Sequence, residues 1–103
     1  MAVSEAELRT FVILRPMPGV GSKTTEDEAH EMAQKSIAVI KALRDEGMRL
    51  EWQVSYLAGD LSVCIYKADD KGTLLEHASR LGIPADIQEP VSFTVTPAWA
   101  EKC

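Results

Sequence analysis

The chain has 103 residues, of which 46% are hydrophobic and 26% are charged, and its formal net charge is −5. This length fits one domain, and the hydrophobic fraction excludes an intrinsically disordered chain. The acidic balance, without a cluster of lysine and arginine, disfavours nucleic-acid binding, because a phosphate backbone requires a concentrated positive surface.

The sequence also disfavours a membrane partner or export. No apolar run approaches the roughly 20 residues that a membrane span requires, and the acidic N-terminus lacks the pattern of a signal peptide. We therefore expect a cytoplasmic protein whose two cysteines, Cys64 and Cys103, are reduced. Residues 1–8 are predicted to form a short leader, residues 9–97 the domain and residues 98–103 a C-terminal tail.

The first half of the domain is predicted to be a strand followed by a long helix. Residues 9–15 are rich in β-forming side chains, and a segment rich in proline and glycine follows them. A helix is predicted to begin near Thr25, because Thr25 with Glu28 three residues later is a capping-box pattern. Apolar residues then recur at helical spacing to Leu43, and Gly47 suits the end of the helix.

Residues 50–58 and 61–68 are predicted to form a hairpin around the two-residue turn Gly59-Asp60. In this register Ser55 faces Cys64, and each face of the hairpin has a consistent character. The apolar face is expected to pack under the helices, and it comprises Trp52, Val54, Tyr56, Leu61, Val63 and Ile65. The polar face is expected to stay open, and it comprises Glu51, Gln53, Ser55, Ser62, Cys64 and Tyr66.

A second helix is predicted from Asp69 or Asp70 to Gly82, and a last strand over residues 89–96. The order β-α-β-β-α-β is that of the ferredoxin-like fold, in the α+β class. Its two helices cover one face of a four-stranded antiparallel sheet. Because a bare sheet face is usually covered, we expect a homodimer through that face.

With these elements in place, the chain resembles the bacterial family known as domain of unknown function 4242, which includes nickel-binding-like proteins. The resemblance spans residues 10–98. It is carried by Pro18-Gly19, Gln34-Lys35-Ser36, Trp52, Ser55-Tyr56, Cys64-x-Tyr66, Glu76-His77-Ala78 and Gly82-x-Pro84-Ala85. The resemblance implies a dimeric ferredoxin-like α/β barrel that binds nickel or another transition metal.

Three residues are the candidate metal ligands. Cys64 offers a thiolate and His77 an imidazole, both suited to nickel, and Glu51 offers a carboxylate oxygen. Each has a plainer interpretation. A free cysteine is often a buried packing residue, a lone helical histidine usually serves packing or the surface, and Glu51 would belong to the polar rim of an interface. No catalytic residue is predicted.

The sequence leaves three functions open. The first is nickel-type metal binding without catalysis. The second is a dimeric barrel that binds or transforms a small organic molecule, oriented by Gln53, Ser55 and Tyr66. The third is a dimeric interaction module. Whether the protein is an enzyme stays open at this stage.

Overall fold

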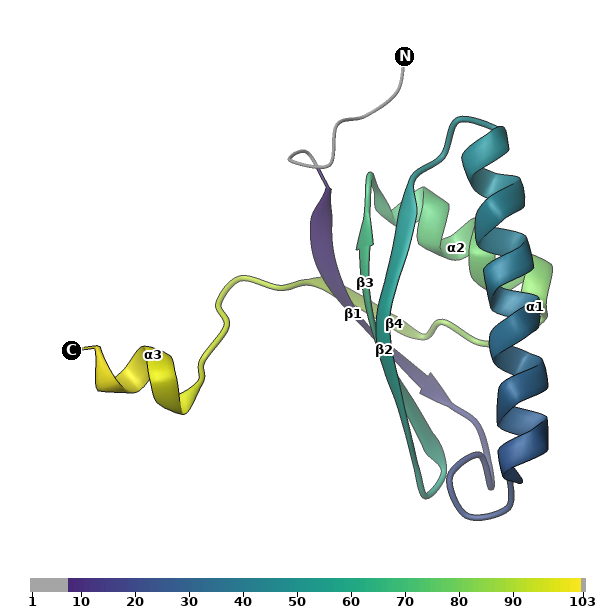
Figure 1. The fold of residues 1–103 in the computed structure, drawn as a ribbon, viewed down its shortest axis with the longest axis horizontal. Coiled ribbons are helices and arrows are strands. Elements are labelled where there is room, and N and C mark those ends of the chain that lie inside the picture. Colours follow the sequence, from purple (N-terminus) through teal and green to yellow (C-terminus); the bar gives the residue numbers. More distant parts are fainter. Residues whose placement is uncertain (1–7, 103) are drawn as a thin grey trace.

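The computed structural model describes residues 8–102, in which two helices pack on one face of a four-stranded antiparallel sheet (Figure 1). The sheet order is β2-β3-β1-β4, which confirms the predicted ferredoxin-like arrangement. The elements are β1 (Arg9–Pro16), α1 (Glu26–Asp45), β2 (Leu50–Ala58), β3 (Leu61–Ala68), α2 (Lys71–Leu81), β4 (Ile87–Pro90) and α3 (Pro97–Glu101). None of the helices within the described residues is long and apolar enough to cross a membrane.

Both long helices begin at caps that the sequence carries. The Thr25 hydroxyl accepts a bond of 3.2 Å from the Glu28 amide, and the Glu28 carboxylate accepts one of 2.9 Å from the Thr25 amide. This capping box confirms the predicted start of α1. Asp70 caps α2, and Gly82 ends it in the left-handed conformation with φ of 69°.

The core lies between the helices and one face of the sheet. On β1, Phe11 and Ile13 are buried, and they pair with Tyr66 and Cys64 of β3 on the same face. Leu50, Leu43 and Leu74 complete this core from β2, α1 and α2.

This arrangement contradicts the predicted choice of faces. Cys64 and Tyr66 are each 3% exposed and lie under the helices, whereas Val63 and Ile65 lie on the face that no helix covers. Both faces of β3 carry apolar side chains, so alternation alone could not decide which one packs. Phe11 decides it, because the β1 register places this large side chain opposite Tyr66.

One extra residue in β2 separates Trp52 from Val54 and Tyr56, which were predicted to share its face. The predicted hairpin register is confirmed, with Ala58 opposite Leu61 and Ser55 opposite Cys64. A β-bulge at Gln53 then shifts the pairing, so that Trp52 lies opposite Tyr66. Trp52 therefore packs against the core together with Leu50.

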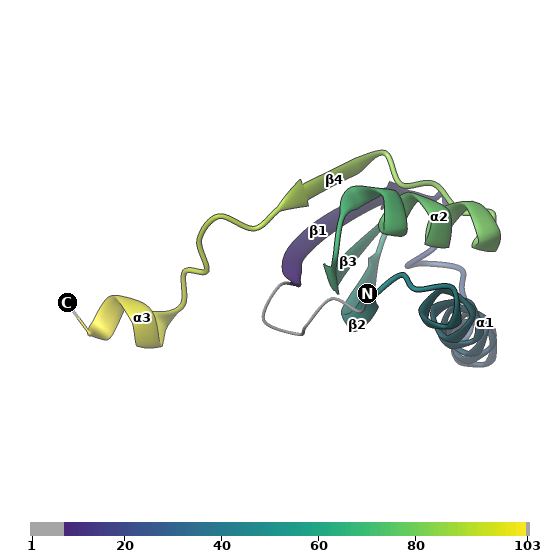
Figure 2. The same cartoon turned by 90° about the horizontal axis from the view of Figure 1, so that it is seen from above.

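The chain beyond β4 differs from the predicted long last strand. β4 ends at Pro90, and one further bond of 2.8 Å joins the Val91 amide to the Thr10 carbonyl. The ladder stops there because β1 begins at Arg9 and offers no further partner. Residues 91–102 form an arm that includes α3 and leaves the sheet on the side away from α1 and α2 (Figures 1 and 2). The predicted leader, except residue 8, and Cys103 lie outside the described residues.

The loop after β1 touches the hairpin turn through a glycine. The Gly21 amide donates a bond of 2.8 Å to the Gly59 carbonyl, and a Cβ at position 21 would lie 2.6 Å from the backbone carbonyl carbon of Ala58. We expect Gly21→Ala to lower the free energy of unfolding by about 2 kcal/mol, because backbone must move to admit the methyl group. Urea denaturation measures this, with the exposed neighbour Ser22→Ala as control. Equal midpoints for the two variants would contradict the expectation.

Candidate functional site

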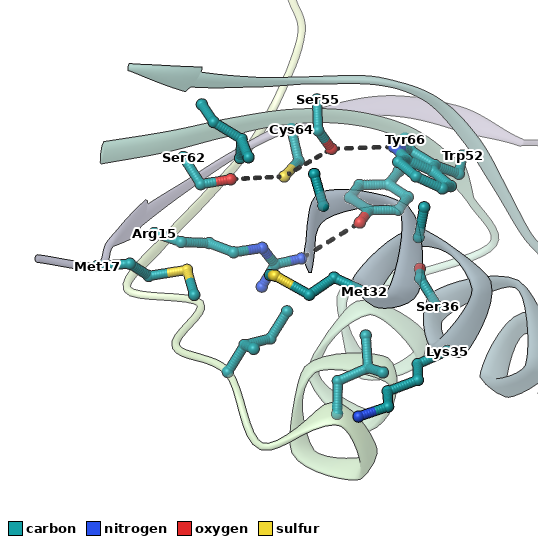
Figure 3. Close-up of a pocket in the computed structure, with 15 residues that line it drawn as sticks. Arg15, Met17, Met32, Lys35, Ser36, Trp52, Ser55, Ser62, Cys64 and Tyr66 are labelled. Atoms are coloured by element: carbon teal, nitrogen blue, oxygen red, sulfur yellow. Dashed lines mark hydrogen bonds between the residues drawn. The ribbon is translucent and has the colours of Figure 1, made fainter. Parts of the chain in front are cut away.

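A cavity of about 320 Å³ opens between the sheet and α1. Its walls are mainly apolar and include Met17, Met32, Trp52, Leu57, Leu81 and Ile83. Five polar side chains from the three adjacent strands face it, and these are Arg15, Ser55, Ser62, Cys64 and Tyr66 (Figure 3). The predicted ligand residues Ser55 and Tyr66 thus meet the predicted metal ligand Cys64 in one wall.

Arg15 is the buried charged group of the cavity, only 1% exposed, and Lys35 of α1 adds a second cation to the lining. One terminal nitrogen, Nη1, donates to the Pro84 carbonyl over 2.7 Å, and Nη2 lies 3.5 Å from the Tyr66 hydroxyl. Its Nε is buried without a hydrogen-bond partner. Within residues 8–102, the ion pairs join exposed side chains, and Arg15 has no carboxylate partner.

Two serine hydroxyls hold the Cys64 sulfur. Ser55 Oγ donates to Cys64 Sγ over 3.1 Å, while it accepts a bond of 2.9 Å from the Trp52 indole. Ser62 Oγ lies 3.3 Å from the same sulfur. Burial raises the pKa of the thiol, but the hydrogen bonds from both serines and the Arg15 charge outweigh burial and hold this pKa below its ordinary value.

Tyr66 keeps its proton throughout the neutral range. Burial is the largest cause, the Cys64 charge adds to it, and together they raise the pKa of the phenol to about 12. The neutral hydroxyl can accept from Arg15 and still present its own O–H to a molecule in the cavity.

His77 lies behind this wall rather than in it. Its ring is fully buried, 5.4 Å from the Tyr66 ring centroid, and its Nε2 is 2.9 Å from Ser36 Oγ. Its Nδ1 is buried without a partner. Burial, and secondly the Arg15 charge, lower the pKa of His77 to about 4, so the ring is neutral near pH 7.

The structure does not bring together all of the predicted site residues. Glu51 pairs with Lys67 on the face away from the helices, so the sheet separates it from Cys64. Gln53 is exposed at the bulge of the edge strand. Across residues 8–102, no three side chains of histidine, cysteine, aspartate or glutamate gather closely enough to hold a metal ion.

Sequence reasoning missed Arg15, although the sequence contained a signal. Arg15, Phe11 and Ile13 occupy alternate positions along β1, so the three side chains lie on the same face, and both of the others are large and apolar. A charged residue that continues an apolar alternation is either a strand end or a buried functional cation. The structure shows that Arg15 is buried.

A family of proteins described as nickel responsive and SCO4226-like matches residues 11–88, more than half of the chain. The chain belongs to this family. The nickel-related resemblance drawn from the sequence is thereby confirmed at the level of the family, and the label domain of unknown function 4242 stays a prediction. The matched region of this nickel-responsive family contains Arg15, Cys64, Tyr66 and His77.

A solved structure with the same fold is SCO4226 from Streptomyces coelicolor A3(2). The two chains are 20% identical and superpose with a TM-score of 0.65, over 84% of this chain and 99% of that one. At this identity the likeness shows the shared fold. No curated protein matches the chain.

Proposed function

We propose that this member of the nickel-responsive family binds nickel as cargo, without a catalytic step, and that Cys64 supplies the thiolate ligand. The observation that carries this proposal is the Cys64 sulfur, held by two hydroxyls beside a cation in the wall of a cavity. Thiolate is a ligand that nickel accepts well. The family description supports the choice of metal.

The chemistry of the cavity favours binding over turnover. General base catalysis needs a group that can take up a proton within reach of the substrate. The described side chains that line the cavity include no carboxylate and no imidazole, and of the remaining titratable groups Cys64 is assigned here to the metal. His77 lies outside the wall, and its lowered pKa makes its neutral ring a weak base.

We expect reduced, chelator-stripped protein to bind nickel stoichiometrically in calorimetry, and Cys64→Ser to weaken this binding by at least about 100-fold, because serine cannot supply a thiolate. Cys103→Ser is the matched control and should bind as the parent does. Unchanged binding by Cys64→Ser would remove Cys64 from the site. His77→Gln and Glu51→Gln in the same titration test the other two predicted ligands.

We also propose that the protein works as a homodimer through the sheet face that carries no helix. This open face comprises Val12, Leu14, Val54, Tyr56, Val63, Ile65 and Ile87. Tyr56 is 60% exposed and Ile87 is 47% exposed, which is unusual for large apolar side chains that share one sheet surface. The arm adds Phe93, Val95 and Trp99, which are also exposed. Pairing with a second copy would remove this surface from water.

A further inference from the structure

The proposed nickel function leaves the buried charge of Arg15 unexplained. A buried guanidinium is costly unless it is paired with an anion, and such cations are seldom left without a carboxylate. Arg15 is 1% exposed, its protein partners are a carbonyl and a phenol, and its Nε has no partner. The neighbouring Cys64 sulfur lies close enough to interact with the Arg15 charge, but Nε stays unsatisfied.

The space in front of Arg15 matches a particular class of molecule. A volume of about 320 Å³ suits a small ligand. Figure 3 shows the Arg15 guanidinium joined to the Tyr66 hydroxyl, and Met32 and Met17 line the same cavity. The apolar walls would accept a hydrocarbon part, and the fork of guanidinium N–H groups fits the two oxygens of a carboxylate.

We propose that the cavity binds a small organic carboxylate, whose carboxylate group pairs with Arg15 and whose apolar part lies against Met17, Met32 and Leu57. The Tyr66 hydroxyl, whose oxygen lies 3.5 Å from Arg15 Nη2, donates a second hydrogen bond to the same carboxylate. This site stands on the geometry of Arg15 and the cavity, and it does not require nickel. If nickel is bound at Cys64, the ligand would also offer carboxylate oxygens, which the described side chains of the wall lack.

Cys64 gives a direct probe of the cavity in the intact fold. In a Cys103→Ser background, iodoacetate and iodoacetamide alkylate the same thiolate with loss of iodide and differ in one charged group. We expect iodoacetate to react faster at Cys64, and the rate ratio of the two reagents to fall by about tenfold or more in Arg15→Gln, which is the effect of one charge-assisted bond. A ratio that favours iodoacetamide in the parent would overturn the proposal.

Calorimetry on metal-free protein gives an independent test. We expect benzoate to bind and its uncharged counterpart benzamide to bind at least about tenfold more weakly. Arg15→Gln should lose the preference for benzoate, whereas Arg9→Gln, at the exposed start of the same strand, should keep it. Equal binding of benzoate and benzamide by the parent would overturn the proposal, as would binding of inorganic phosphate in place of benzoate.

These experiments separate the two proposals. The carboxylate measurements contain no metal, and the nickel titration contains no carboxylate, so either can fail while the other succeeds. Circular dichroism checks the fold of Arg15→Gln. If that variant does not fold, the two reagent pairs on the parent protein still test for a carboxylate site, since within each pair a neutral amide replaces the carboxylate.

Discussion

Val63→Lys should convert a dimer of the protein into a monomer. Val63 lies between Leu14 and Tyr56 at the centre of the open face. If a second copy covers this face, the substitution buries an ammonium group with no partner and should weaken association by at least about 100-fold. Sedimentation equilibrium should find twice the chain mass of 11.3 kDa for the parent and a single mass for the variant.

A matched control separates the effect of changing the open face from the effect of adding a positive charge. Ile37 is 50% exposed on α1, so Ile37→Lys adds the same group on the helical side of the molecule and should leave the dimer intact. A parent protein that sediments at the mass of one chain would contradict the homodimer. Equal masses for the two variants would place the interface elsewhere.

Acid should destabilise the fold through His77. Its pKa in the folded protein is about 4, below the ordinary 6.5, so between these values the unfolded chain takes up a proton that the folded chain refuses. The stabilising contribution is complete above about pH 7 and is lost as the pH falls toward 4. The free energy of unfolding should drop by about 3 kcal/mol over this interval from His77 alone.

The measurement is urea denaturation of the parent and of His77→Gln from pH 7 to pH 4. Glutamine can still bond to Ser36 but does not titrate, so the variant should lose the part of the pH dependence that belongs to His77. The other histidine, His30, is exposed, and His30→Gln should retain the parent profile. Parallel profiles for the parent and His77→Gln would show that His77 does not set the acid sensitivity.

Much of the fold could be predicted because local signals agreed with one another. Thr25 with Glu28 marked the start of α1, and Gly59-Asp60 fixed the hairpin register that joins Ser55 to Cys64. The packed face could not be predicted in the same way. β3 is apolar on both sides, and only its pairing with Phe11, distant in sequence, selects the Cys64 side.

The candidate site was predicted in part for the same reason. Ser55, Cys64 and Tyr66 were expected together because hairpin pairing is local. Arg15 joins them only through the pairing of β1 with β3, and His77 reaches the back of Tyr66 only through the packing of α2. Strict alternation of side chains along β2 would place Glu51 on the same face as Ser55 and Cys64. The extra residue at Gln53 interrupts this alternation, so Glu51 lies on the opposite face.

That extra residue changes which side chains of β2 point toward the helices. Before Gln53 the even-numbered residues Leu50 and Trp52 face the core, and after it the odd-numbered residue Ser55 does. In an uninterrupted strand, the alternation set by Leu50 and Trp52 would point Val54 toward the helices and Ser55 away from them. A single inserted position therefore determines whether the thiol of Cys64 has a hydroxyl or a hydrocarbon beside it, and changes in length here would alter its chemistry without touching the cavity residues.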